Sequence, residues 1–226
     1  MNTLSNSTEI INAAFGGSQA KQWEVSENRS AQAITGLRIL LLAIGSLFFL
    51  FIVALLTRSQ FSDYESLSAA WQPFAQPWLL WINTGLLVIA GASLHWARTS
   101  VRNQQHNKTI EGLLLAGLFT SAFLIGQWMV WQQLITRGYF MASNPANSFF
   151  YLLTGLHALH ILVGMVALVL ATAKIHRGIS QQKAVVKVTL CAIYWNFLLV
   201  VWLILFALLA SPPSAFEAFA KLCGLR

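Results

Sequence analysis

Long apolar stretches that carry no charged side chain alternate with short polar segments along this chain. Five of them reach the length of roughly 20 residues that a helix needs to cross a hydrocarbon core of about 30 Å. They occupy residues 39–57, 75–94, 112–136, 148–173 and 188–210. Strands of a membrane barrel would instead alternate apolar and polar residues over about 10 positions. The pattern therefore predicts an all-α, polytopic membrane helix bundle with five transmembrane helices.

The composition agrees with a membrane protein. Charged residues make up 9% of the 226 residues, and hydrophobic residues make up 57%, whereas a soluble domain carries about 25% charged residues. The chain has two cysteines. Cys191 lies within the fifth apolar stretch and Cys223 lies beyond it, so they indicate neither a disulfide framework nor a metal cage.

Three segments follow from this pattern. Residues 1–35 are polar and mixed in charge, residues 36–210 form the five-helix transmembrane domain, and residues 211–226 form a short external tail. The first segment lacks an apolar run of its own, and the first run after it is a full span. We therefore expect residues 1–35 to be a cytoplasmic tail and not a signal peptide.

Positive charge is distributed unevenly between the connecting segments, and this bias predicts the orientation. Ten of the 14 lysines and arginines fall before the first span or in the loops after the second and fourth spans. By the positive-inside rule the N-terminus is then cytoplasmic and the C-terminus periplasmic. Clustered cations that face anionic lipid account for the net charge of +7, so no nucleic acid is expected as a partner.

The apolar stretches contain few groups that could carry chemistry. All seven acidic residues lie in tails, loops or at a helix end, which argues against a proton or ion pathway through this chain. His157 and His160 are the exception, since both fall within the fourth stretch. They lie three residues apart on one helix, so they cannot be the two axial ligands of a haem held between facing helices. No intramembrane carboxylate or suitably placed cysteine completes a metal site with them.

On the residues alone, a packing role for this histidine pair is favoured over a ligand site. Polar side chains in neighbouring spans are candidate hydrogen-bond partners, and such contacts determine which helices pair. The candidates are Asn83, Thr84, Gln127, Thr154 and Asn196.

The same region resembles a known signature. Residues 154–164 read TGLHALHILVG, which resembles the Thr-Gly-Phe-His-Gly-x-His-x-x-x-Gly motif of subunit III of the haem-copper terminal oxidases, with Thr154, His157, His160 and Gly164 in register. Further matches follow in the family's order over residues 35–210. They are Asn83 and Thr84 in the second span, Gln127 in the third, and Tyr194, Trp195, Asn196 and Trp202 in the fifth.

The chain departs from the family pattern at its intramembrane acids. Ala43 and Ile44 stand where a Ser-Glu pair is common, Val130 replaces a glutamate, and Leu199 replaces an aspartate. Asn196 also stands where the family has a histidine. A role that depends on those carboxylates therefore does not carry over to this chain.

The resemblance implies a subunit of a proton-pumping respiratory terminal oxidase, of the cytochrome c oxidase type, in a bacterial inner membrane. Such a subunit is non-catalytic: it stabilises the catalytic subunit, binds lipid and supports proton uptake during oxygen reduction. Haem and copper are expected in partner subunits, and no cofactor in this chain. The implied partners are catalytic subunit I, subunit II, phospholipids and, where a supercomplex forms, an electron-donor complex. Arg98 and Arg102 are the candidate contacts for lipid headgroups.

Other functions remain open at this point. A subunit-III-like protein associated with nitric oxide reductase shares the histidine motif, and a quinol oxidase also contains a subunit III. An independent transporter would show inverted repeats or broken helices. A membrane cytochrome would show haem absorbance when the chain is isolated by itself.

Overall fold

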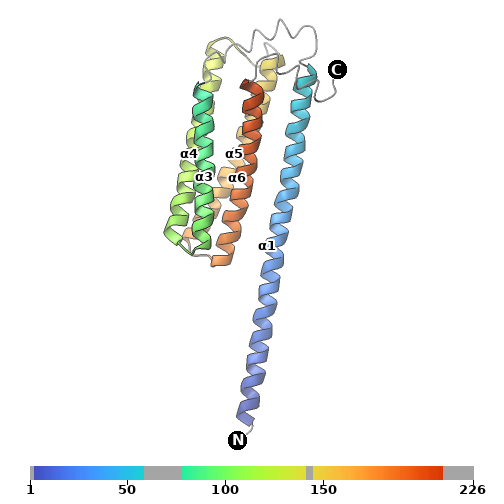
Figure 1. Ribbon diagram of the computed structural model, residues 1–226, viewed down its shortest axis with the longest axis vertical. Helices are drawn as coiled ribbons and strands as arrows, with labels where there is room; N and C mark the ends of the chain where they lie inside the picture. Colours follow the sequence, from blue (N-terminus) through green and yellow to red (C-terminus); the bar gives the residue numbers. More distant parts are fainter. Residues whose placement is uncertain (1–2, 59–77, 141–144, 211–226) are drawn as a thin grey trace. The chain divides into compact units, whose positions relative to one another are not determined.

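The computed structural model describes the backbone of residues 3–58, 78–140 and 145–210, and the side chains within 31–58, 78–140 and 147–208 (Figure 1). It divides into two compact units, Met1–Leu40 and Leu41–Arg226. The predicted external tail, together with Asp63, Glu65, Cys223 and part of the second predicted span, lies outside the described residues.

The described residues are almost entirely helical. The helices are α1 (Thr3–Arg58), α3 (Trp78–Arg102), α4 (His106–Thr136), α5 (Pro145–His176) and α6 (Gln181–Ala210). Each contains a segment of at least 25 residues that is apolar enough to cross a membrane. At 1.5 Å per residue, 25 residues span about 37 Å, more than the hydrocarbon core of about 30 Å. The predicted all-α bundle with five spans is therefore confirmed.

The helices extend beyond the predicted apolar stretches. α4 begins at His106, six residues before the predicted start, and α6 begins at Gln181, seven residues before it. Charged residues such as Lys108 and Glu111 had excluded these turns from the apolar windows. Such side chains are compatible with a helix where it emerges from the hydrocarbon. The backbone of α1 is likewise helical from Thr3, through most of the segment predicted as a tail.

The short connections between α3 and α4 and between α5 and α6 each contain a residue in the left-handed conformation. Gln104 has a φ of 58° between α3 and α4, and Gly178 has a φ of 80° after α5. The Gly178 amide donates to the Ile175 carbonyl over 3.0 Å, which satisfies one of the last carbonyls of α5. Both connections lie at one end of the bundle, called here the basic end (Figure 1). Its cationic side chains include Arg98, Arg102, Lys108, Lys174, Arg177, Lys183 and Lys187.

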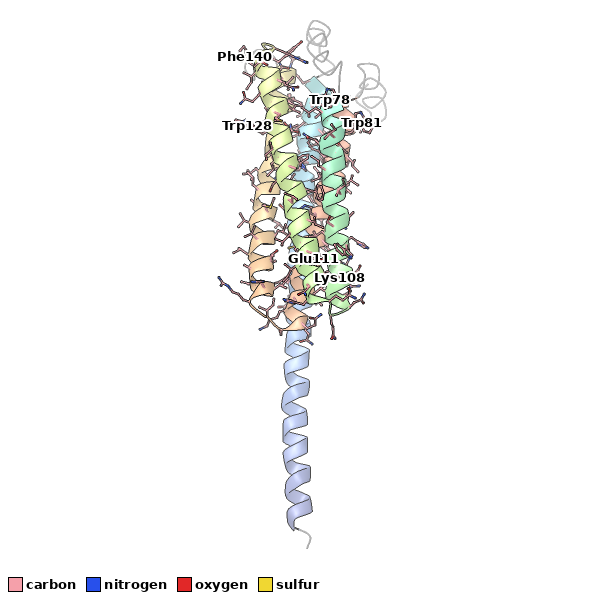
Figure 2. All side chains as sticks on the ribbon, turned by 90° about the vertical axis from the view of Figure 1, so that its left-hand side faces the viewer. Trp78, Trp81, Lys108, Glu111, Trp128 and Phe140 are labelled. Atoms are coloured by element: carbon pink, nitrogen blue, oxygen red, sulfur yellow. The ribbon has the colours of Figure 1, made fainter. Side chains whose placement is uncertain are left out.

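Helices α3, α4, α5 and α6 form a closed ring in which each helix packs against two neighbours. Within the second unit, the part of α1 after Leu41 packs against α5 and α6 through Phe48, Leu55, Leu153 and Leu205. The outer faces carry large apolar side chains, as expected for a surface that contacts lipid or another span. Figure 2 shows Lys108 and Glu111 near the basic end, and Trp78, Trp81 and Trp128 toward the other end.

Candidate functional site

Three tryptophans of the bundle donate hydrogen bonds to threonines on other helices. The indole nitrogen of Trp202 lies 3.0 Å from the Thr84 hydroxyl and joins α6 to α3. The other two bonds, both 3.2 Å long, run from Trp195 to Thr120 and from Trp131 to Thr154. Together they connect α3, α4, α5 and α6 through polar side chains inside the ring.

Each of these threonines also bonds to its own helix. The hydroxyls of Thr84, Thr120 and Thr154 donate to the carbonyls four residues earlier, over 2.8, 2.7 and 2.7 Å. A hydroxyl provides one donor and two acceptor lone pairs. The threonine therefore satisfies its donor within the helix and accepts the indole N–H from the neighbouring helix.

The three bonded tryptophan–threonine pairs and His157 of α5 are called here the buried polar layer. The His157 side chain is fully buried. Its ring stacks on Trp202 with the ring centres 5.2 Å apart and an interplanar angle of 27°. Phe123 of α4 approaches it edge-on at 6.2 Å, and Phe48 of α1 does so at 6.4 Å. Aromatic packing on three sides holds the imidazole in place.

The hydrogen bonds expected between His157 and neighbouring polar side chains do not form. Neither of its ring nitrogens has a partner among the described residues. Two of the expected partners, Thr84 and Thr154, instead accept bonds from Trp202 and Trp131. An indole N–H is a donor only, so these tryptophans use the threonine oxygens that sequence reasoning had assigned to the histidines.

His160 lies in a different environment from His157. Its Nδ1 donates to the Leu156 carbonyl over 2.7 Å, and its ring packs against Phe48 with the ring centres 5.6 Å apart. The side chain is half-buried, toward the first span. Both histidines therefore contact Phe48, but only His157 lies inside the ring of four helices.

Asn83 and Gln127 form a second part of the buried polar layer. Both side chains are 1% exposed, and their amide atoms have no hydrogen-bond partner among the described residues. The Asn83 amide lies directly against Gly126, where a Cβ atom would collide with it. Gln127 is one turn from both Phe123, which contacts His157, and Trp131, which bonds to Thr154. The polar groups of α3, α4 and α5 thus lie at similar depth.

The glycine that ends the histidine motif allows α5 and α6 to approach closely. A Cβ atom on Gly164 would lie 2.6 Å from Cε1 of Tyr194 and 3.0 Å from Cζ3 of Trp195. The Tyr194 hydroxyl donates to the His160 carbonyl over 2.8 Å, which ties α6 to the turn of α5 before this glycine. Gly164, Tyr194 and Trp195 therefore form one helix contact.

The remaining predicted residues lie apart from this layer. Asn196 is exposed on α6, near the middle of its span, and cannot serve as an internal partner of His157. Arg98 is half-buried near the basic end, with its Nε lacking a partner among the described residues, and Arg102 is exposed one turn later. Thr120, Phe123 and Phe48 are members of the layer that sequence reasoning missed. Thr120 could have been found in the sequence in the same way as Thr84 and Thr154, because it is a polar residue within an apolar span.

Within the described residues, no three histidine, cysteine, aspartate or glutamate side chains lie close enough together to hold a metal ion. The arrangement instead combines aromatic packing with hydrogen bonds between helices.

Comparison with known proteins agrees with the motif. The family model of cytochrome c oxidase subunit III matches residues 23–210, which includes α3 to α6 and most of α1. Cytochrome c oxidase subunit 3 of Pylaiella littoralis is 29% identical over 164 residues, which cover 70% of this chain and 59% of that protein.

Two further relatives give the same result. Cytochrome c oxidase subunit 3 of Drosophila yakuba is 28% identical over 66% of this chain and 57% of its own length. The haem-copper oxidase subunit I+III of Aeropyrum pernix is 27% identical over 56% of this chain and 16% of its own length. The chain spans less than two thirds of the length of these relatives. Because the family model covers the whole described bundle after residue 23, the chain belongs to the cytochrome c oxidase subunit III family.

Proposed function

We propose that this chain is a non-catalytic subunit of a proton-pumping respiratory terminal oxidase of the cytochrome c oxidase type, where it stabilises the catalytic subunit and supports proton uptake. The observation that carries the proposal is the family match over residues 23–210. Haem and copper then belong to partner subunits I and II. The chain's own contribution is a rigid bundle held by the tryptophan–threonine bonds and the packed imidazole of His157.

Asn196 supports association with a partner inside the membrane. It is exposed near the middle of α6 and lies among apolar neighbours such as Val200, which is 54% exposed. An amide that faces hydrocarbon loses its hydrogen bonds with water, and it regains them by pairing with a polar group on another helix. We therefore assign this face of α6 to a span of the catalytic subunit. The Aeropyrum pernix relative, whose name combines subunits I and III in one chain, is consistent with such a pairing.

The charge distribution supports an orientation with the basic end in the cytoplasm of a bacterial cell. Lys108, Lys174 and Arg177 are exposed at this end, as the positive-inside rule requires of a cytoplasmic surface. Arg98 and Arg102 project from the last turns of α3 at the same end. We propose that their guanidinium groups bind lipid phosphates, because a cation at that depth meets the headgroup layer.

Affinity purification of the full chain from its own membrane in mild detergent tests the proposal. Native electrophoresis with mass spectrometry should identify a larger polypeptide that carries haem and copper, with an oxidase absorbance spectrum. Purification of the chain alone, with a Soret band of its own, would contradict the non-catalytic assignment. Recovery with a nitric oxide reductase would assign the chain to that complex instead.

The variant His157→Leu separates a packing role from a ligand role in the purified complex. We expect His157→Leu to lower the amount of this chain per catalytic subunit, while the haem absorbance per catalytic subunit stays unchanged. A variant that kept full stoichiometry but lost haem absorbance would make His157 a ligand.

Asn196→Leu tests the proposed contact with the catalytic subunit. It should weaken association about threefold, the value of one average hydrogen bond between membrane helices. The matched control is Ser93→Ala, because the Ser93 hydroxyl already bonds to the Ile89 carbonyl of its own helix.

A further inference from the structure

Three polar side chains inside the bundle have no hydrogen-bond partner among the described residues. They are Asn83 on α3, Gln127 on α4 and His157 on α5, and both polar atoms of each are unpaired. Asn83 and Gln127 are each 1% exposed, and His157 is 0% exposed. All three lie within helices that are apolar enough to span a membrane. Polar groups are rarely left unpaired in such surroundings, because burial removes their hydrogen bonds with water.

Contacts along α4 place the three side chains at one level of the bundle. Gly126 lies directly against the Asn83 amide, where a Cβ atom would collide with it. Gln127 follows Gly126 in the chain and lies one turn after Phe123. The ring centre of Phe123 is 6.2 Å from that of His157. We call Asn83, Gln127 and His157 the amide–imidazole cluster.

The chemistry of the cluster selects a small neutral ligand. Each amide offers an NH₂ donor and a carbonyl acceptor, and a neutral imidazole offers one donor and one acceptor. An ion would lose its hydration inside an apolar span, at a high cost in free energy. Water both donates and accepts, and a site for one water needs only about 10–15 Å³. Buried waters typically make about three hydrogen bonds to groups that otherwise lack partners, and the cluster offers three such side chains.

We propose that the amide–imidazole cluster binds water inside the transmembrane bundle, through hydrogen bonds to Asn83, Gln127 and His157. The bound water joins α3, α4 and α5, and it supplements the direct tryptophan–threonine bonds of the buried polar layer. The site requires only the folded bundle and no oxidase partner. A failure of this proposal therefore leaves the proposed function untouched.

Two tryptophans provide a matched pair of reporters for this site. Trp202 and Trp195 are both 1% exposed, and the indole of each donates to a threonine. Trp202 stacks on the His157 ring, with the ring centres 5.2 Å apart. Trp195 instead lies against Gly164, about 10 Å away along α6 at 1.5 Å per residue. Only Trp202 is therefore adjacent to the cluster.

X-ray footprinting of the full chain in detergent micelles measures the difference between the two tryptophans. X-rays split water into hydroxyl radicals, which oxidise the side chains next to a bound water, and mass spectrometry gives the oxidation rate of each residue. We expect Trp202 to be oxidised several-fold faster than Trp195. The comparison is made within one unmodified chain, so it does not depend on any variant folding.

Substitutions in the cluster test whether its polar atoms hold the water. Gln127→Leu and Asn83→Leu each remove two polar atoms, and each should lower the oxidation rate of Trp202 toward that of Trp195. Gln132→Leu is the matched control, because it makes the same substitution at an exposed position of α4, and it should leave both rates unchanged. Stability is a poorer readout, because leucine removes the amide together with its need for a partner.

Three results would overturn the proposal. One is equal oxidation of Trp202 and Trp195 in the unmodified chain, because the cluster would then be dry or its side chains would pair with one another. Another is a Trp202 rate that neither Gln127→Leu nor Asn83→Leu lowers. The last is an equal decrease in Gln132→Leu, because the effect would then not come from the cluster.

Discussion

Replacing Gly164 by alanine adds one methyl group where α5 meets α6. The added carbon would lie 2.6 Å from Tyr194 and 3.0 Å from Trp195. Ordinary van der Waals contact between carbons begins near 3.5 Å, so the overlap is about 0.9 Å with Tyr194 and about 0.5 Å with Trp195. Neither ring can move freely. The Tyr194 hydroxyl is bonded to the His160 carbonyl, and the Trp195 indole is bonded to Thr120. The helices must therefore separate, or at least one of these bonds must lengthen.

Overpacking of this kind costs about 1–3 kcal/mol. Alanine is also a better helix former than glycine, by about 1 kcal/mol in water, which partly masks the collision. Gly155→Ala on the same helix provides the correction, because a Cβ atom there meets nothing within 4 Å. The difference between the two variants isolates the packing term. We expect Gly164→Ala to be about 1–3 kcal/mol less stable than Gly155→Ala.

Reversible unfolding of the purified chain in mixed micelles, followed by tryptophan fluorescence as SDS is increased, measures this difference. Trp195 lies in the contact, so its emission should also shift in the folded Gly164→Ala variant. Equal unfolding midpoints for the two alanine variants would refute the close approach of α5 and α6 at Gly164.

Three further substitutions can be followed by the same unfolding assay. Trp202→Phe should cost more than about 0.6 kcal/mol, the average for a hydrogen bond between membrane helices, because the smaller ring also loses packing against His157. A double-mutant cycle with Thr84→Val isolates the bond and should return a coupling of about 0.6 kcal/mol; zero coupling would contradict the bond. Gln127→Leu should leave stability unchanged or raise it, because its buried amide has no partner among the described residues, and a loss above about 1 kcal/mol would indicate a bound partner. Gly126→Ala should destabilise through collision with the Asn83 amide, and Asn83→Ala should restore much of the loss; failure of this rescue would exclude that contact.

The number of spans could be read from the sequence because a helix that crosses hydrocarbon must be apolar over its whole length. The ends of the helices could not be read from the sequence, because helices continue into the aqueous layer, where charged side chains are tolerated. α4 includes Lys108 and Glu111 for this reason. The stop of α5 had a local signal in Gly178, which adopts the left-handed conformation typical of a helix end.

The polar residues of the layer were also visible in the sequence, but their pairing was not. His157 and His160 look equivalent in the motif, yet one is enclosed by aromatic rings and the other bonds to its own helix. Asn196 was expected inside and lies outside. The hydroxyl oxygens of Thr84 and Thr154 accept hydrogen bonds from indole N–H groups and not from the histidines, since a buried tryptophan usually needs an acceptor for its N–H.

The sequence by itself determined that the chain crosses the membrane five times, and through the histidine motif it indicated the family that the comparisons confirmed. Only the tertiary structure decided which face of each helix points inward and which threonine pairs with which tryptophan. The physical reason lies in the solvent. A lipid tail is as apolar as a protein core, so a transmembrane helix needs no polar outer face, and the hydrophobic pattern that orients helices in water is absent here.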